Sequence, residues 1–447
     1  MSKTDQPVTR KNQVQLKPLT REPQFSLAVP GSKSIANRAL LLAGFAQGCS
    51  RLAAVPESDD TAHAIAALQS LGVACQRENG VVEVMGHGLA LPVSSGEVAI
   101  GSSGTVGRFL PGLLAAAPKG DWCLTASPQL ASRPLAPLLA ALQGLGGTLE
   151  GSPDGASFPL RVKGGGLAGG EVTLSARDSS QFASGVLLAA PLAREAVVVN
   201  ITDLDPEEAY INITLAMLSR FGVTYASQPG PDCLRVAFPA PQAYQPVNFP
   251  VEADSNSAMY FLVLPLVVGG QAEINNLNPA SGQPGLRFLE IIQRLGGKVL
   301  AGPDRVTVSR DKAPLAGGFT VDMRSRSEMA LTLGVLAVFA DAPITMTNLA
   351  HIRGHESDRL AVLAHTLAAV GVKTEAGDDW IRIHPLARDK ILNTLVDSHN
   401  DHRLAMSFAI LGLAANGITI QGPEAVNKTF PGFFPLLASI GAEVSFL

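Results

Sequence analysis

Basic side chains that could bind an anionic substrate recur along the chain beside segments rich in Gly, Ser, Asp or Asn. They are Lys33, Arg38, Arg108, Arg133, Arg359, Arg403 and Lys428. Any one of them alone is typical of a surface turn. As a set they lie next to apolar segments, where a solvated charge is out of place. Together they predict a cationic cleft suited to a ligand that carries both a carboxylate and a phosphate.

Helices must position these cations, and the chain contains six copies of one helical pattern. In each copy apolar residues at helical spacing end in a Gly, and a β-type residue follows within a few positions. The glycines are Gly72, Gly146, Gly222, Gly296, Gly371 and Gly441, so the copies are spaced by 70 to 76 residues. Gly at this place is typical of a left-handed helix C-cap. The period predicts an array of one supersecondary unit.

A second and more apolar helix is predicted before each of these. The six segments are 36–46, 106–117, 182–193, 257–268, 329–340 and 404–415. They are apolar nearly all round, which indicates burial, and none reaches the roughly 18 uninterrupted apolar residues of a membrane span. Short polar runs before them, at 31–34, 101–105, 178–181, 254–257, 325–327 and 399–401, predict N-caps. If these helix starts converge, their free N–H groups and positive dipole ends would form an anion site.

Composition bounds the class of protein. At 447 residues two domains are expected, and 46% hydrophobic with 16% charged residues predicts a globular chain. A net charge of −4 argues against nucleic acid as a partner, and the four cysteines lack CxxC spacing and are expected to be reduced thiols. About the first twenty residues are polar and basic, which suggests a loose tail. No signal-peptide pattern opens the sequence, so we expect a cytoplasmic location.

Several motifs together resemble one enzyme family. Residues 29–38, Val-Pro-Gly-Ser-Lys-Ser-Ile-Ala-Asn-Arg, look like the opening signature of the 5-enolpyruvylshikimate-3-phosphate (EPSP) synthases. The further matching motifs are Gly104-Thr105 with Arg108, Arg133-Pro134, 179–182 (Ser-Ser-Gln-Phe), 356–360 (Glu-Ser-Asp-Arg-Leu), 401–406 (Asp-His-Arg-Leu-Ala-Met) and 428–431 (Lys-Thr-Phe-Pro). They occur in order and cover the chain past its N-terminal tail, so the resemblance is specific.

The resemblance implies a two-domain α/β (α+β) fold, an inside-out α/β barrel of six βαβαββ repeats with the active site in the cleft between the domains. We expect the chain to cross between the domains near residues 29–31 and 252–254. The upper domain would then be residues 31–252, and the lower domain residues 1–30 plus 253–447, including the N-terminal strand. A monomer without cofactor or metal is expected.

The family moves the enolpyruvyl group of phosphoenolpyruvate to the 5-hydroxyl of shikimate-3-phosphate and releases phosphate. The reaction needs a proton delivered to the methylene carbon, a proton taken from the hydroxyl, and cations over the phosphate and carboxylate. The resemblance implies that Arg359 and Arg403 clamp the carboxylate. It assigns the phosphate end to Lys33, Gly104, Arg133, Gln181 and Lys428. Because Gly104 leaves room for the donor substrate, sensitivity to glyphosate, which competes for that site, is expected.

Catalytic roles are expected for four residues, namely Lys33, Glu328, Glu356 and Lys428. Glu356 matches the family carboxylate that protonates the methylene carbon, although an ion pair with Arg359 at a helix start would also explain it. The proton transfer needs a raised pKa at Glu356, whereas Arg359 would lower it. Glu328 stands where the family has an Asp that accepts the hydroxyl proton.

The acceptor side departs from the family pattern. The residues implied to bind the acceptor are Ser34, Arg38, Ser179, Ser180, Gln181, Tyr210, Glu328, His351 and His355. However, Glu207 replaces a phosphate-binding Ser, Ala209 replaces a Pro, and His355 replaces a Lys. An added anion and a lost ammonium each weaken phosphate binding. The alternative is therefore a diverged homologue that acts on an unphosphorylated or different cyclitol acceptor, by transfer or by dehydration.

Paired histidines invite a metal site, which we consider the weaker interpretation. His351 and His355 are four apart and His399 and His402 three apart, but Gly354 interrupts the first pair and no HExxH motif occurs. Residues 164–169 fit GxGxxG without a strand–helix context, which predicts a turn between strands.

Two other functions fit the sequence less well. An RNA-binding or RNA-end-processing protein on related units would need a basic outer face, which the net charge of −4 disfavours. The related cell-wall enzyme acting on a UDP-sugar carries a reactive Cys in a loop that corresponds here to 126–133, where none occurs.

Asp59 and Asp60 are predicted to be charges on a helix dipole. Small anionic substrates remain the predicted partners, with no nucleic acid and no membrane.

Overall fold

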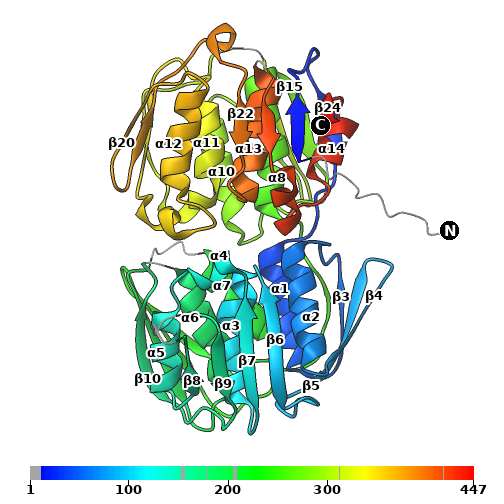
Figure 1. Cartoon of the computed structure of the whole chain (residues 1–447), viewed down its shortest axis with the longest axis vertical. Helices are drawn as coiled ribbons and strands as arrows, with labels where there is room; N and C mark the ends of the chain where they lie inside the picture. Colours follow the sequence, from blue (N-terminus) through cyan, green and yellow to red (C-terminus); the bar gives the residue numbers. More distant parts are fainter. Residues whose placement is uncertain (1–11, 153–156, 178, 205–208, 312, 416) are drawn as a thin grey trace, which may run out of the picture.

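Among the described residues, six four-stranded sheets share one strand order and lie in two lobes (Figure 1). The computed structural model describes residues 12–152, 157–177, 179–204, 209–311, 313–415 and 417–447. In one sheet β6 (Ser95–Gly101) pairs parallel with β7 (Asp121–Ala126), and β9 (Leu160–Lys163) pairs antiparallel with β7 and β8 (Thr148–Glu150). Helices connect β6 to β7 and β7 to β8. The predicted α/β fold of βαβαββ units is therefore confirmed.

Two further sheets are also continuous in sequence. Their strands are β10 (Gly170–Ser175), β11 (Val197–Thr202), β12 (Ala226–Pro229) and β13 (Leu234–Phe238), and β18 (Thr320–Asp322), β19 (Ile344–Thr347), β20 (Thr374–Ala376) and β21 (Ile381–Ile383). In both, the first two strands are parallel and the last two antiparallel. The run 164–169 lies between β9 and β10, as predicted for a turn between strands.

The other three sheets are each completed by a strand from a distant part of the chain. β14 (Asn248–Pro250) pairs with β3 (Gln47–Ala53), beside β5 (Val81–His87) and β4 (Ala74–Glu78). β2 (Gln24–Leu27) pairs with β15 (Gly270–Ile274), beside β17 (Val306–Arg310) and β16 (Lys298–Ala301). β1 (Gln13–Leu16) lies between β23 (Thr419–Gln421) and β24 (Val444–Phe446), and β22 (Leu395–Asp397) pairs with the other edge of β23.

The strand β1 corrects one expectation. The N-terminal segment was expected to be a loose tail, yet residues 13–16 form a central strand in which Val14 and Leu16 are fully buried. Two apolar residues with alternating spacing were enough for this segment to form the strand between β23 and β24 that completes the last sheet. Burial of their side chains stabilises the strand against the entropy of fraying.

Each unit packs one buried helix and one half-buried helix on its sheet. The buried helices are α1 (Lys33–Gly44), α3 (Gly104–Ala116), α6 (Ser180–Ala189), α8 (Ser255–Leu262) with α9 (Leu264–Val268), α11 (Ala330–Ala337) and α13 (His402–Ala414). The half-buried helices are α2 (Asp59–Ser70), α5 (Ala136–Gly144), α7 (Ala209–Arg220), α10 (Phe288–Arg294), α12 (Arg359–Ala369) and α14 (Phe433–Ser439). The six predicted capping glycines follow the second set with φ between 82° and 96°, as a left-handed C-cap requires.

Short helices fill the connections. They are α4 (Pro128–Ala131) and the 3-10 helices η1 (Ala190–Leu192), η2 (Pro284–Arg287), η3 (Arg324–Met329), η4 (Ala350–Gly354), η5 (Arg388–Lys390) and η6 (Pro423–Lys428). Several predicted segments differ from the structure. The segment 182–193 is α-helical only to Ala189 and continues as η1. The segment 257–268 divides into α8 and α9 because Pro265 lacks an N–H for the carbonyl four residues before it. The run 325–327, predicted as an N-cap, belongs to η3, which is kinked at Arg326.

The two lobes have separate hydrophobic cores. One core contains residues between Ile35 and Val251, and the other combines residues between Val14 and Val29 with residues between Ala253 and Ala442. The two chain crossings lie side by side, because Ser32 N donates to Glu252 O over 2.7 Å and the backbones of 31 and 253 form a bridge. We propose the division into 31–252 and 1–30 plus 253–447 on this basis. No helix in the described part of the chain is long and apolar enough to cross a membrane.

Candidate active site

A cavity of about 620 Å³ is lined by residues of both lobes. Most residues that the sequence assigned to the site line it, namely Lys33, Ser34, Arg38, Arg133, Ser179, Ser180, Gln181, Tyr210, Glu328, His351, His355, Glu356, Arg359 and Arg403. The other two lie against these residues: Lys428 pairs with Glu356, and a carbon added at Gly104 would touch Arg133 and Gln181. Residues spread over some 400 positions are therefore brought together.

Helix starts carry much of this wall. Lys33, Gly104, Ser180 and Arg359 are the first residues of α1, α3, α6 and α12, and Arg403 is the second of α13. Free N–H groups and positive dipole ends therefore add to the cationic side chains. The predicted N-cap side chains are present in three of the buried helices: Ser179 on α6, Asp254 on α8 and Asp401 on α13. Ser32 and Ser103 precede α1 and α3 without a side-chain cap bond.

The two arginines expected to hold the carboxylate of phosphoenolpyruvate are buried side by side and paired with protein carboxylates. Arg359 Nε lies 2.8 Å from Asp401 Oδ2, and its Nη1 lies 3.4 Å from Glu328 Oε2. Arg403 Nε lies 2.5 Å from the same Glu328 oxygen. Burial raises the pKa of Glu328, but Arg403 and Arg359 outweigh burial and lower the pKa to about 2. Glu328 is thus an ionised counter-charge in this arrangement.

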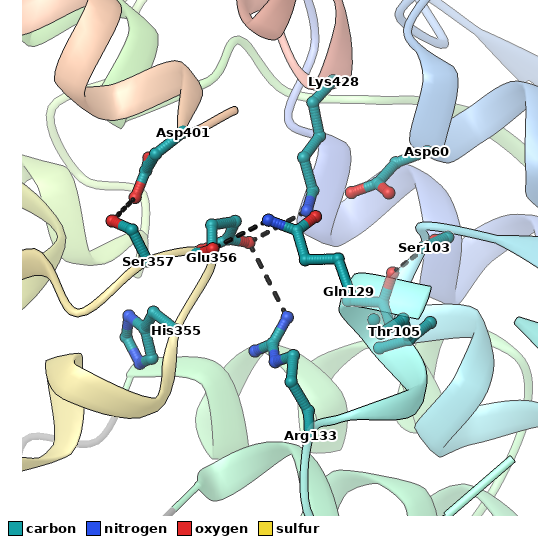
Figure 2. A network of polar contacts seen from close by, with 12 residues as sticks. Asp60, Ser103, Thr105, Gln129, Arg133, His355, Glu356, Ser357, Asp401 and Lys428 are labelled. Atoms are coloured by element: carbon teal, nitrogen blue, oxygen red, sulfur yellow. Dashed lines mark hydrogen bonds and ion pairs between the residues drawn. The ribbon is translucent and has the colours of Figure 1, made fainter. Parts of the chain in front are cut away.

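Glu356 occupies the other half of the same cationic cluster. Its carboxylate lies 2.7 Å from Arg359 Nη2, 3.2 Å from Lys428 Nζ and 3.9 Å from Arg133 Nη1. Figure 2 shows Lys428 and Arg133 approaching Glu356 from opposite sides. Burial raises the pKa of Glu356, yet Lys428, Arg359 and Arg133 together hold that pKa well below its usual value. The sequence left open whether Glu356 has a raised or a lowered pKa. In this structure the cations lower the pKa, so the Glu356 carboxylate is charged.

Lys33 and Asp60 form a buried pair that the sequence did not predict. Lys33 Nζ lies 2.8 Å from Asp60 Oδ2, and Asp60 is 1% exposed. Asp60 was predicted to be a charge on the dipole of a helix, and it does lie in the first turn of α2. Its burial and its pairing with Lys33 of α1 were not predicted. Burial lowers the pKa of Lys33, but Asp60 and Glu356 outweigh burial and raise the pKa above its usual value. Lys33 remains a cation.

Gly104 borders the same end of the cavity. A Cβ at this position would lie 3.0 Å from Arg108 Nη1 and 3.3 Å from Arg133 Nη1. Arg108 is buried and donates to Gly104 O over 3.1 Å. Burial and the neighbouring Arg133 lower the pKa of Arg108 to about 9. The space over Gly104 is thus enclosed by guanidinium groups, as a phosphate site requires.

On the acceptor side, a buried arginine and several serine hydroxyls line the cavity. Arg38 is buried, and its guanidinium donates to Thr214 Oγ1, Ser34 O and Tyr210 O. It therefore fixes α1 against α7 in addition to lining the cavity. Ser179 accepts from Gln181 N, so its hydroxyl hydrogen stays available to a ligand. Ser34 and Ser180 lie beside these residues on the same wall.

The two histidines of the acceptor side are uncharged in this arrangement. Arg359 Nη1 lies 2.9 Å from His355 Nδ1, and since a guanidinium only donates, the ring hydrogen of neutral His355 lies on Nε2. Burial and Arg359 lower the pKa of His355 to about 3. His351 contacts Ser327 Oγ over 2.8 Å, and burial lowers its pKa. His355 therefore does not replace the positive charge of the family Lys.

Several site residues escaped sequence reasoning. Asp401 was noted in a motif and as a helix cap, but not as the partner of Arg359. Gln129 was missed entirely, and its amide donates to Glu356 O over 2.7 Å. Arg324 also lines the cavity, and among the described residues no hydrogen bond or ion pair engages its guanidinium. The only sign of Arg324 in the sequence was that a basic residue stands four positions before Glu328, a predicted site residue. Glu207, the departure that was predicted to weaken phosphate binding, lies outside the described residues.

Comparison with known proteins identifies the family of this chain. The family model for EPSP synthase (3-phosphoshikimate 1-carboxyvinyltransferase) matches residues 22–437. The chain belongs to the EPSP synthase family. It is 36% identical over 435 residues to "3-phosphoshikimate 1-carboxyvinyltransferase 2" of Halalkalibacterium halodurans, with 97% of this chain and 95% of that protein covered. The resemblance drawn from the motifs is thereby confirmed.

Solved structures give the same fold. An EPSP synthase from Acinetobacter baumannii superimposes with a TM-score of 0.79 at 26% identity, covering 97% of this chain and 99% of that chain. The enolpyruvyl transferase NikO from Streptomyces tendae has a TM-score of 0.73 at 16% identity, covering 97% of this chain and 98% of that chain, which supports the fold alone.

Proposed function

We propose that this EPSP synthase family enzyme transfers the enolpyruvyl group of phosphoenolpyruvate to the 5-hydroxyl of shikimate-3-phosphate and releases phosphate. The observation that carries the proposal is the cluster of Arg133, Arg359, Arg403 and Lys428 around two ionised glutamates in one interdomain cavity. Family membership names the reaction. The diverged alternative, with an unphosphorylated or different acceptor, gains no support from the relatives.

The donor substrate has both anions that this cluster needs. In the protein alone, Glu328 contacts both Arg359 and Arg403, and Glu356 contacts both Lys428 and Arg133. The carboxylate of phosphoenolpyruvate would replace Glu328 between Arg359 and Arg403, and its phosphate would replace Glu356 between Lys428 and Arg133. The phosphate carries more charge than the Glu it displaces, so the exchange is electrostatically favourable in a buried site.

Glu356 is proposed as the acid. The acceptor oxygen forms a bond to C2 of the enolpyruvyl group while the methylene carbon takes a proton. The resulting methyl group then returns a proton, the C2–O bond to phosphate breaks, and the double bond is restored. One group can deliver and recover this proton. Once the substrate anions engage Lys428, Arg133 and Arg359, the pKa of Glu356 rises because burial is no longer offset.

Glu328 is proposed as the base for the acceptor hydroxyl. A carboxylate whose pKa is about 2 is a poor base. Release from Arg403 by the substrate carboxylate would raise that pKa, so donor binding would activate the base. The extra methylene of Glu relative to the family Asp supplies the reach between Arg403 and the acceptor side. Lys33 and Lys428 are proposed to stabilise the departing phosphate.

The remaining expectations stay predictions of this proposal. The enzyme is expected to act in the cytoplasm as a monomer on two small anionic substrates, and without a cofactor. The described residues contain no group of three or more His, Cys, Asp and Glu side chains that could hold a metal ion.

The decisive experiment is phosphate release from phosphoenolpyruvate with shikimate-3-phosphate or plain shikimate as the acceptor. Release with shikimate-3-phosphate alone is expected. Activity with neither acceptor, or with shikimate only, contradicts the proposal. Arg403→Ala should abolish phosphoenolpyruvate binding, whereas Arg382→Ala, an exposed arginine on β21, should not.

A further inference from the structure

One side chain of the first lobe holds the backbone of the proposed acid in the second. Gln129 Nε2 donates to the carbonyl oxygen of Glu356 over 2.7 Å, and the two residues are 227 positions apart. Figure 2 shows the Gln129 side chain reaching Glu356, with Lys428 and Arg133 on either side. The contact is to main chain, so it is independent of the protonation of the Glu356 side chain.

Gln129 is presented by a well-anchored turn. It is the second residue of α4, which Ser127 caps by accepting from Leu130 N over 3.3 Å. Leu130 is buried in the core of the first lobe and fixes the turn. Arg133 follows two residues after the end of α4, on the same short segment as Gln129. Both reach Glu356, one at its carbonyl and the other at its carboxylate.

The loop that carries Glu356 is held differently on its other side. Ser357 Oγ donates to Asp401 Oδ2 over 3.0 Å, and Asp358 caps α12 by accepting from Ala361 N over 3.0 Å. Both contacts are made within the second lobe. The peptide of Glu356 itself is held across the cleft by Gln129. The orientation of that peptide sets the direction of the Cα–Cβ bond, and through it the place of the carboxylate.

We propose that Gln129 is a positioning residue that links placement of the Glu356 carboxylate to closure of the two lobes. The inference rests on the proposed function, since Glu356 is the acid only there. When the lobes are apart, the hydrogen bond is absent and the Glu356 loop is held from one side. When they close, Gln129 fixes the peptide, and this contact to the main chain remains after the substrate phosphate has drawn Arg133 away from the carboxylate. Proton transfer is then efficient only in the closed, water-excluding state.

The test compares two glutamine substitutions of identical chemistry. Gln129→Met keeps the length of the side chain and its neutrality but removes the amide. Gln143→Met removes an amide-to-carbonyl bond inside the first lobe, from Gln143 to Leu149 O. We expect Gln129→Met to lower kcat roughly 2- to 13-fold, the range for one neutral hydrogen bond, with little change in the KM for phosphoenolpyruvate. Gln143→Met should leave kcat unchanged. Equal kcat for wild type and Gln129→Met would overturn the proposal.

A double-mutant cycle separates positioning from a general structural role. In a Glu356→Gln background, followed in single turnovers with enzyme in excess, Gln129→Met should cause no further loss, because the group that it positions is gone. The same fold-loss in both backgrounds would contradict the proposal. If wild type itself releases no phosphate with shikimate-3-phosphate, the proposed function fails. If wild type is active and the cycle is additive, only the role of Gln129 fails.

Discussion

Glu328 Oε2 lies 2.5 Å from Arg403 Nε and 3.4 Å from Arg359 Nη1. An internal carboxylate thus occupies the arginine pair that is proposed to receive the carboxylate of phosphoenolpyruvate. The substrate carboxylate must displace Glu328 from the arginines, and the free energy that this displacement costs weakens the binding of phosphoenolpyruvate. The protein alone is therefore in a self-neutralised state, in which the acid and the base are both held as counter-ions of the clamp.

Removing this internal competitor should tighten substrate binding. Glu328→Gln leaves Arg359 and Arg403 under-neutralised, so we expect the Kd for phosphoenolpyruvate without acceptor to fall about tenfold, equivalent to about 1.4 kcal/mol. The kcat should fall at the same time, because the proposed base is lost. Glu290→Gln is the matched control, since Glu290 pairs with Arg326 at an exposed position. Calorimetric titration measures the Kd for phosphoenolpyruvate of both variants, and steady-state kinetics measures their kcat. An unchanged or weaker affinity in Glu328→Gln would disprove the competition.

Substrate binding should be accompanied by proton uptake. Lys428, Arg359 and Arg133 hold the pKa of Glu356 well below its usual value in the protein alone, so Glu356 is ionised at neutral pH. Phosphoenolpyruvate neutralises these cations and the pKa of Glu356 rises, so the complex binds protons that the free enzyme does not. The observed binding enthalpy should therefore depend on the ionisation enthalpy of the buffer, and this dependence should grow as pH falls toward the raised pKa.

Glu356→Gln is the control for this uptake. It keeps the shape of the side chain and cannot titrate, so the buffer dependence should largely disappear. Proton release on binding by wild type, or uptake of equal size in Glu356→Gln, would show that another group titrates. His355 and His402 are the neighbours to consider, although burial lowers the pKa of both and leaves them neutral.

The period of the glycines and the apolar segments predicted the fold because both depend on local physics. A left-handed C-cap and an all-round apolar helix can be recognised within about ten residues. The motifs in turn located most of the site, including Lys33 and Arg359. What the sequence did not reveal was pairing. Asp60 and Gln129 matter because of the partners that tertiary packing gives them, and neither residue differs in type or spacing from a surface residue at a helix start.

Arg324, whose guanidinium has no hydrogen bond or ion pair within the described part of the chain, is predicted to contact the acceptor phosphate. Arg324 lines the cavity near His351, and because His355 is neutral, it offers a charge that the family Lys would supply. Arg324→Ala should raise the KM for shikimate-3-phosphate roughly 10-fold, in line with one charged hydrogen bond, and leave the KM for phosphoenolpyruvate unchanged. Steady-state kinetics, in which each substrate is varied in turn, measures the two KM values. Arg382→Ala on β21 is the control. Equal effects on both KM values would contradict a phosphate contact.

Gly104 should set the response to glyphosate. A Cβ at this position would lie 3.0 Å from Arg108 Nη1 and 3.3 Å from Arg133 Nη1, so both guanidiniums must shift by a few tenths of an ångström and the donor end narrows. Gly104→Ala should therefore raise the glyphosate concentration needed for half inhibition and also raise the KM for phosphoenolpyruvate. The fold is not at risk, because Ala is favoured over Gly in a helix by about 1 kcal/mol. Gly165→Ala, where a Cβ meets no atom within 4 Å, is the control. Inhibition that is identical in wild type and Gly104→Ala would place the inhibitor, and with it the donor substrate, elsewhere in the cavity.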